Sequence, residues 1–376
     1  MTKRERVLKI LVLAACVMCV SFSLFCPKEA SEAAFRAISL CAKSVVPSLF
    51  LFMVSSKILL GCGGAEAFSR ATHGGVEKLL GVSKSGSVAV FLGLLCGYPT
   101  GAVVIADALS RGKMKKSEAQ SLLPFVTAAS PAFLVGAVGS SLFSSGGYGA
   151  VLLLAQTLSA LILMLITRKS RFGSAISDIG AEEERPFLTV ISSSVKESGT
   201  AVIYVCSFVT FFCVFSEMIL CFLPCGGAIK ALVNGFFEIS GGFALLSQNA
   251  QSFFEKYFLG GTMLGFSGAS VLMQSASVLA DSGVSMKRYA AGKAAQSVLC
   301  GVLSLALGAI FEKSAPVFAF TLFGTEAPKM ISAAEFAVIF AFAFAILAFF
   351  TAVILKILSF FSKKRENFQK TVEKKR

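Results

Sequence analysis

The stretch GLLCGYPTGA, residues 93–102, lies in the middle of an apolar segment that runs from about residue 86 to residue 107. Pro99 removes a backbone donor and the glycines let the chain turn, so the stretch disfavours a straight helix. Two arms of about ten residues would each rise about 15 Å, which is half of a hydrocarbon core of about 30 Å. The stretch therefore predicts a re-entrant helical hairpin between Lys84 and Arg111, and a kinked spanning helix is the alternative.

The composition of the whole chain is that of a membrane protein. Of its 376 residues, 55% are hydrophobic and 15% are charged, and the mean hydropathy is +0.78. A soluble domain carries about 25% charged residues. Apolar segments long enough to cross a bilayer recur along the chain, at about 7–26, 40–61, 86–107, 121–143, 147–167, 199–222, 227–248, 256–282, 290–311 and 333–361. We predict an all-α polytopic membrane protein with about eight transmembrane helices and two re-entrant hairpins.

The formal charge of +14 is concentrated in short clusters at the ends of apolar segments. This pattern is typical of cytoplasmic loops, whereas a nucleic-acid site needs a continuous basic face. We therefore expect a lipid bilayer as partner, no nucleic acid, and both termini in the cytoplasm of a bacterial cell. If every strongly basic cluster is cytoplasmic, the segments 86–107 and 256–282 must each begin and end on the same side, as hairpins do.

The N-terminus has a basic start followed by the apolar residues 10–25, as in a secretory signal. No small-x-small cleavage site follows, because the chain continues with Leu24, Phe25, Cys26 and Pro27. We therefore expect an uncleaved signal-anchor helix.

A second glycine-rich stretch, residues 260–270, reads GGTMLGFSGAS and resembles the first. Each stretch is followed by an aspartate, Asp107 or Asp281, and then by a basic turn that contains a Met-Lys pair. Interrupted apolar segments at corresponding places in two halves indicate a transporter-like binding site. The sequence predicts an internal duplication and leaves open whether the two halves are parallel or inverted.

Several motifs resemble the YlbJ-type sporulation integral membrane proteins of the nucleoside-recognition, or Gate domain, group. The blocks are GYPTGA at 97–102, VPSLF at 46–50, SPAFLVG at 130–136, GFFEI at 235–239 and GFSGASV at 265–271. The resemblance covers roughly residues 30 to 311, although Ala128 and Ala129 stand where an Asn would suit the family. It implies a membrane protein linked to spore formation, similar in part to concentrative nucleoside transporters and to the ferrous iron transport protein B.

The resemblance also implies a division of the chain. We expect an N-terminal transmembrane helix at 1–30, a first Gate-like half at 31–167, a basic cytoplasmic linker at 168–187, a second Gate-like half at 188–311, and a C-terminal transmembrane helix with a basic tail at 312–376.

Glu238 is the main candidate for chemistry, because it falls near the middle of the apolar segment 227–248. A carboxylate inside a membrane is costly unless it is protonated, paired or in contact with water, so it marks a functional site by default. A protonated side chain that only bonds across helices is the structural alternative. We expect the substrate-binding site to include Gly97, Tyr98, Pro99, Gly101, Ser130, Pro131, Asn234, Glu238, Gly265, Phe266, Ser267, Gly268, Ser270 and Gln274.

The sequence contains no phosphate-binding loop, no nucleophile elbow and a single histidine, His73. We therefore expect no enzyme, no cofactor and no metal site. The predicted function is a permease or channel for a small polar solute, and the alternative is a scaffold for assembly of the spore envelope. A homo-oligomer is compatible with either.

Overall fold

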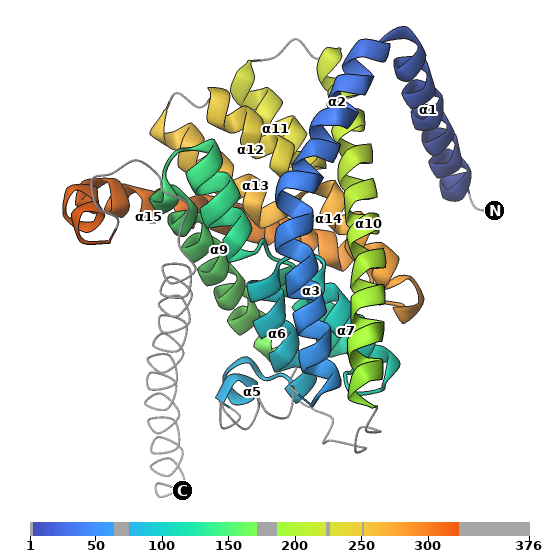
Figure 1. Cartoon of the computed structure of the whole chain (residues 1–376), viewed down its shortest axis with the longest axis vertical. Helices are drawn as coiled ribbons and strands as arrows, with labels where there is room; N and C mark the ends of the chain where they lie inside the picture. The colour runs from blue at the N-terminus through green and yellow to red at the C-terminus, as the bar shows by residue number, and fades with distance from the viewer. Residues whose placement is uncertain (1–2, 64–74, 171–185, 223–225, 250–251, 323–376) are drawn as a thin grey trace, which may run out of the picture.

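The computed structural model describes residues 3–63, 75–170, 186–222, 226–249 and 252–322, and in these ranges the chain is helical with no strand (Figure 1). The first half contains α1 (Lys3–Phe25), α2 (Pro27–Leu40), η1 (Cys41–Val45), α3 (Val46–Gly61), α5 (Gly75–Leu80), α6 (Lys84–Cys96), α7 (Thr100–Ser110), α8 (Lys116–Val126), η2 (Ala132–Leu142), α9 (Gly146–Ile166) and η3 (Thr167–Ser170). The second half contains α10 (Phe187–Cys221), α11 (Gly227–Phe237), α12 (Ile239–Asn249), η4 (Glu255–Leu259), α13 (Gly260–Phe266), α14 (Gly268–Val278), η5 (Ala280–Ser282) and α15 (Met286–Leu322).

Three of the described helices have stretches long and apolar enough to cross a bilayer: Gly146–Ile166, Phe187–Cys221 and Met286–Glu312. The helical stretches Leu13–Phe25 and Pro27–Lys43 meet at a bend of 105°. Counted together, they are long and apolar enough to form a fourth span. The predicted spans 86–107, 121–143, 227–248 and 256–282 are divided into shorter helices. The predicted span 333–361 and most of the predicted linker lie outside the described residues. Together these helices confirm an all-helical, multi-pass architecture, while the number of spans stays a prediction.

Two pairs of short helices fold back on themselves, α6 with α7 and α11 with α12. Their 11 to 13 residues give lengths of about 17–20 Å, which is less than a bilayer core of about 30 Å. The first pair matches the hairpin predicted at 86–107. In Figure 1 the α6–α7 pair lies toward one end of the molecule's long axis and the α11–α12 pair toward the other.

The second hairpin was predicted at the wrong place. We predicted it at 256–282, but α13 and α14 in that region do not pack along each other as the two hairpin pairs do. The paired helices α11 and α12 lie upstream, at 227–249. The sequence predicts a single span there, at 227–248. The glycines at 260 and 261 have another role, since they allow close contact of α13 with Tyr148 of α9 and Ser304 of α15.

The two halves repeat the same order of elements. In each half a hairpin is followed by a helix with a break near its middle and then by a long helix. The broken helices are α8 with η2, interrupted at 127–131, and η4–α13 with α14, interrupted at Ser267. The long helices α9 and α15 pack against each other.

Loops that carry basic residues make contact with other parts of the chain in two places. Arg168, after α9, donates from Nη2 to the Lys78 carbonyl oxygen (2.6 Å). Gln120 in α8 exchanges two hydrogen bonds with the backbone of Ser285, next to the basic start of α15 (2.6 and 3.1 Å). Segments far apart in the sequence therefore lie together at these two places.

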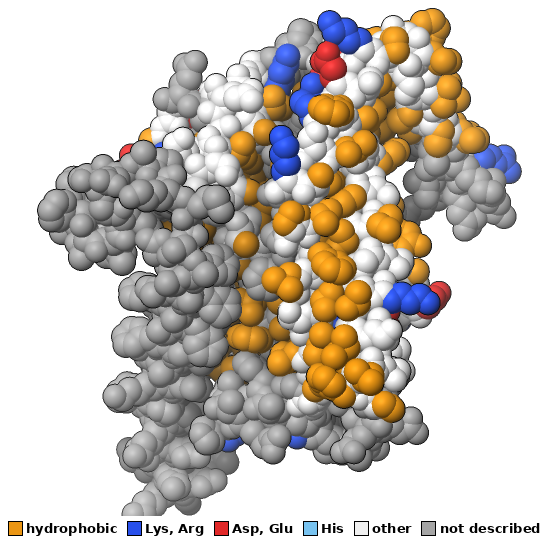
Figure 2. Space-filling view, viewed as in Figure 1, with side chains coloured by type: hydrophobic (Ala, Val, Ile, Leu, Met, Phe, Trp, Pro, Cys, Tyr) orange, Lys and Arg blue, Asp and Glu red, His pale blue; other side chains and the backbone are white. Residues whose placement is uncertain are grey.

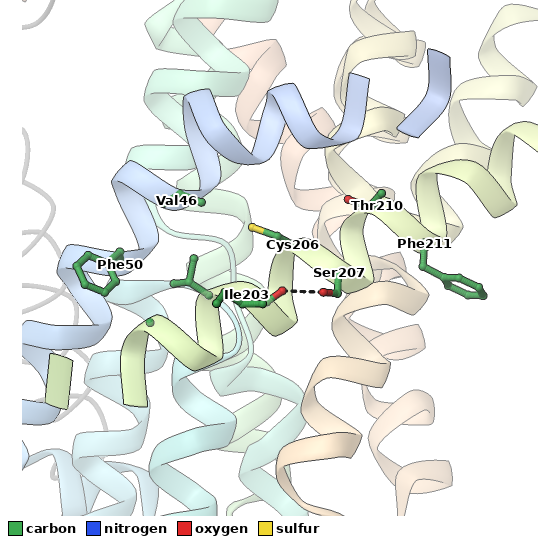
Figure 3. A pocket seen from close by; sticks show the side chains of 9 residues that line it. Val46, Phe50, Ile203, Cys206, Ser207, Thr210 and Phe211 are labelled. Atoms are coloured by element: carbon green, nitrogen blue, oxygen red, sulfur yellow. Dashed lines mark hydrogen bonds between the residues drawn. The ribbon is translucent and has the colours of Figure 1, made fainter. Parts of the chain in front are cut away.

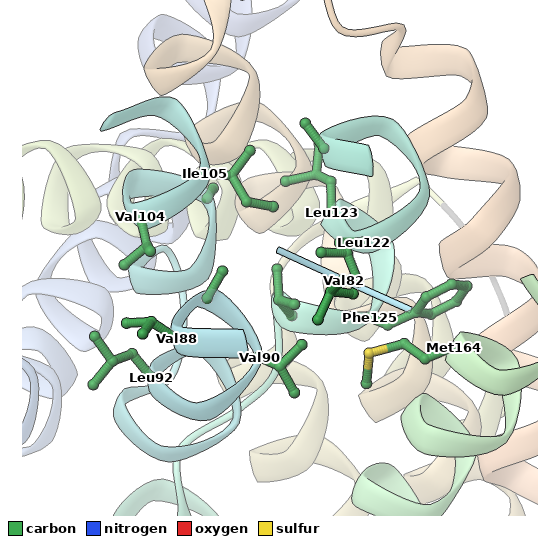
Figure 4. Packing of buried hydrophobic residues seen from close by; sticks show 14 of the residues in the cluster. Val82, Val88, Val90, Leu92, Val104, Ile105, Leu122, Leu123, Phe125 and Met164 are labelled. Carbon is green, nitrogen blue, oxygen red and sulfur yellow. The ribbon is translucent and has the colours of Figure 1, made fainter. Parts of the chain in front are cut away.

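The first hairpin is held by an apolar cluster shared with α8 and the end of α9 (Figure 4). Two glycines, Gly93 on one arm and Gly101 on the other, make this packing close. A Cβ atom at either position would collide with the carbonyl oxygen of Val126. The arms of the hairpin therefore press against the last residue of α8, immediately before the chain breaks.

Apolar side chains cover α3 and α10 on the face seen in Figure 2. Leu51, Ile203 and Phe211 are more than half exposed there. Isolated exposed apolar residues are common in soluble proteins, but a continuous apolar face of this kind is typical of contact with lipid or with another protein.

Candidate functional site

The tip of the first hairpin lies against the break in the neighbouring helix. Gly97 ends α6 with φ +82° and ψ 179°, a conformation that is almost restricted to glycine. A Cβ atom there would lie 3.0 Å from both the backbone nitrogen and the Cβ of Ser130. Tyr98 and Pro99 complete the turn into α7, so the tip is fixed beside residue 130.

We predict that Gly97→Ala lowers the melting temperature of the purified protein. The backbone conformation alone should cost about 1–3 kcal/mol, and the contact with Ser130 adds to it. The control is Gly112→Ala, since Gly112 also has a positive φ of +67° but has no atom within 4 Å of its would-be Cβ. Equal shifts for the two variants in thermal unfolding would contradict the close contact at the hairpin tip.

The break between α8 and η2 is stabilised by side chains from two other helices. Gln156 of α9 accepts from the Ala129 backbone nitrogen (2.9 Å) and donates to the Ala129 carbonyl oxygen (3.0 Å). Lys293 of α15 donates from Nζ to the Thr127 carbonyl oxygen (2.9 Å), and Tyr289 donates to Thr127 Oγ1 (3.1 Å). These bonds replace those that the backbone loses where the helix stops.

Ser130 and Pro131 restart the helix. The Ser130 hydroxyl accepts from the Phe133 backbone nitrogen (3.3 Å), as an N-terminal capping residue does. Pro131 follows it with helical backbone angles, a position where the missing N–H does no harm. Both predicted residues therefore lie at the break, but these contacts define it rather than bind a ligand.

Glu238 lies at the tip of the second hairpin and not within a continuous span. Its backbone is extended between α11 and α12, and its side chain is 2% exposed. The carboxylate accepts from the Gly241 backbone nitrogen (2.8 Å) and lies 3.9 Å from the Cys213 thiol of α10. Among the described residues no cation forms an ion pair with it.

The break at Ser267 lies against this second tip. Ser267 has φ +72°, in the left-handed region. A Cβ atom on the adjacent Gly268 would lie 3.3–3.4 Å from the backbone of Gly235, Phe237 and Ile239. The rings of Phe266 and Phe236 stack at 5.1 Å between centroids.

The other predicted residues of this segment bind each other or neighbouring helices. Gln274 donates to the Ser270 hydroxyl (3.0 Å) within α14. Gly265 lets α13 approach the backbone of Gln296 and Ser297 on α15, because a Cβ atom there would lie 2.6 Å from both. These residues support the site and do not leave polar groups unpaired.

Tyr98 brings the two halves together. Its hydroxyl is buried beside the Ser267 side chain of the second half, and apart from that neighbour it has no hydrogen-bond partner among the described residues. Asn234 Oδ1, one turn before Glu238, is also buried without a hydrogen-bond partner. Because buried polar groups are nearly always paired, these atoms mark a place suited to a polar ligand.

The structure therefore brings together most of the predicted residues and adds some that the sequence analysis missed. The tip around Gly97 and Tyr98 meets the break at 127–131, and the tip at Glu238 meets the break at Ser267. Missed residues are the polar side chains that bind the first break: Thr127, Gln156, Tyr289, Lys293 and Gln296. A signal was available for Lys293, since a lysine inside an apolar segment is as unusual as Glu238.

A groove of about 780 Å³ lies elsewhere, between α3 and α10 (Figure 3). Val46 and Phe50 line one side, and Cys206, Thr210 and Phe211 are among the residues of α10 on the other. No predicted site residue lines it. It belongs to the apolar surface and is separate from the polar centre.

Comparison with known proteins shows similarity both in sequence and in structure. No protein-family model matches the chain. The sporulation integral membrane protein YlbJ of Bacillus subtilis (strain 168) is 25% identical over 319 residues, which cover 75% of this chain and 78% of that protein. Structures of CNTnw, in an inward-facing substrate-bound state and in an outward-facing state, align with TM-scores of 0.46 and 0.43. Both CNTnw chains are 14% identical to this chain. Each alignment covers 82% of this chain, and the two alignments cover 87% and 86% of the CNTnw chains, respectively. The sequence relative and the apolar helices together identify a multi-pass membrane protein.

Proposed function

We propose that the chain is a carrier or channel for a small polar solute, with its site where the two hairpin tips meet the two broken helices. The observation that supports this most directly is the group of buried polar atoms around Tyr98, Asn234 and Glu238. Non-helical backbone at membrane depth is tolerated only where protein or a water-filled cavity surrounds it. Two halves with such breaks in corresponding places are typical of secondary transporters.

The chemistry of the site favours a solute rich in hydrogen-bond donors. The Glu238 carboxylate and Asn234 Oδ1 are acceptors, and the Tyr98 hydroxyl can donate or accept. A solute with hydroxyl or amino groups would satisfy all three. In this proposal Glu238 recognises the solute, and Tyr98 links the recognition to the other half of the protein.

We further propose an inverted arrangement of the halves, with both termini in the cytoplasm. The α6–α7 hairpin would enter from the cytoplasmic side and the α11–α12 hairpin from the other side. The loops after Arg111, Arg168 and Lys287 would then all be cytoplasmic, as the positive-inside rule requires. The similarity to a sporulation protein supports a role in the membrane of a spore-forming bacterium.

The test is solute uptake into proteoliposomes that contain the wild type or Glu238→Gln. We would screen nucleosides, small carboxylates and divalent cations. A solute that enters with the wild type should enter no faster than in protein-free liposomes with Glu238→Gln. The reason is that the glutamine amide carries no charge and presents an NH2 donor where the carboxylate presents only acceptors.

The matched control is Glu217→Gln. Glu217 accepts a hydrogen bond from Arg36 (2.8 Å) at the exposed contact of α2 with α10, so this variant should transport like the wild type. Absence of flux for every solute, together with normal spores for a Glu238→Gln strain, would instead favour a scaffold for assembly of the spore envelope.

A further inference from the structure

Lys293 places an amino group inside the protein next to the first break. Its side chain is 1% exposed. The ammonium donates to the Thr127 carbonyl oxygen and to Gln296 Oε1, both at 2.9 Å. Within the described ranges it forms no ion pair. A buried charge without a counter-charge is costly, so its position requires a compensating interaction.

The compensation comes from a carbonyl group that Pro131 leaves free. In a continuous α-helix the Thr127 carbonyl would accept from the N–H of residue 131, four positions later. Proline has no N–H, so that bond cannot form. The carbonyl also lies at the C-terminal end of α8, where the helix dipole places partial negative charge. The break therefore creates a position that attracts a cation.

In broken membrane helices such carbonyl groups commonly bind the coupling ion, which is Na⁺ or H⁺. Here the Lys293 amino group already occupies the position, since it donates to the Thr127 carbonyl oxygen. The surroundings from the other elements are neutral: Tyr289 bonds to Thr127 Oγ1 and to Ser275 (both 3.1 Å). The Gln296 amide bonds the ammonium through Oε1, and its Nε2 is left without a partner.

We propose that Lys293 is a tethered cation that takes the place of a free monovalent cation at the break between α8 and η2. The protein would then need no sodium ion to fold this break. If the chain is a carrier, as proposed above, its transport would also need no sodium gradient at this position. Truncation of the lysine should convert the position into a binding site for a small monovalent cation.

The experiment measures thermal unfolding of the full-length protein in detergent, in sodium, potassium, methylammonium or choline chloride at equal ionic strength. The wild type should melt at the same temperature in all four salts. Lys293→Ala should melt lower in choline, and sodium or methylammonium should raise its melting temperature by about 1 °C or more, because 1 kcal/mol corresponds to about 1 °C in a chain of this size.

Lys293→Met is the matched control, because methionine fills most of the same space without a charge. Its melting temperature should not depend on the salt. A wild type stabilised by sodium over choline would overturn the proposal, and that comparison needs no variant. The proposal would also fail if Lys293→Ala responded no more to cations than Lys293→Met, or if it stayed unfolded in every salt while Lys293→Met folded.

These measurements do not depend on finding a transported solute. Failure of the uptake assay would leave the melting results unchanged, and a failed melting test would leave the role of Glu238 untouched. Once a solute is known, uptake with sodium replaced by choline provides the second readout. Wild-type flux should be unchanged by that replacement.

Discussion

Gly101→Val should remove most of the folded protein. Gly101 lies in the first turn of α7, and the Cβ of any larger residue would collide with the Val126 carbonyl oxygen. This neighbour is backbone at the end of α8 and cannot rotate away as a side chain could. Gly93 presses on the same carbonyl from the other arm, so the hairpin cannot shift without losing its own packing.

The expected loss is about 3 kcal/mol or more, the upper part of the range for overpacking a core. Typical proteins have only about 5–15 kcal/mol of stability. The fraction of monodisperse protein in size-exclusion chromatography and the melting temperature of the remainder would measure the loss. Gly101→Ala should give a smaller loss of the same kind.

Gly136→Val provides the control for this prediction. Gly136 is also helical, in η2, and has no atom within 4 Å of its would-be Cβ. The substitution there brings the same change in intrinsic helix propensity, but the valine meets no backbone. If both variants fold equally well, the first hairpin does not depend on its contact with α8.

The sequence alone predicted the turn between α6 and α7 for a clear physical reason. Gly97, Pro99 and Gly101 each change what the backbone can do, and the basic residues on both sides limit where the ends can lie. The local residues therefore carried enough information to predict a turn within an apolar segment.

The second hairpin was missed because its turn has little local signature. Glu238 alone separates α11 from α12, and the apolar residues on both sides add up to the length of one span. The glycine-rich stretch at 260–270 looked like the missing copy. Its glycines instead permit close helix contacts across the fold, which the sequence does not distinguish from turns.

The polar contacts of the first break depend on tertiary structure. Lys293 binds Thr127 across 166 positions of sequence, and no local pattern links the two. Pro131 has no N–H with which to continue a helix, and a break in a helix leaves carbonyl groups free. The identity of the side chain that would bind them could not be read from the neighbouring residues.

Several polar side chains bond to the break between α8 and η2. Of the substitutions that would remove one of them, Gln156→Leu should cause the largest loss of stability. Gln156 is 1% exposed, and its amide satisfies both the N–H and the carbonyl group of Ala129. Leucine has a similar size but leaves both groups buried and unpaired. Each orphaned group costs about 1–3 kcal/mol, so the two together approach the loss expected for Gly101→Val.

Thermal unfolding of the purified variant would measure this loss, with Gln248→Leu as control. Gln248 is exposed near the end of α12, so the same chemical change there should shift the melting temperature little. Gln156→Glu should give an intermediate result, because the carboxylate accepts from the Ala129 N–H but, when ionised, cannot donate to its carbonyl group. Equal stability of Gln156→Leu and the wild type would mean that water replaces the amide, and the centre of the protein would then be more hydrated than its packing indicates.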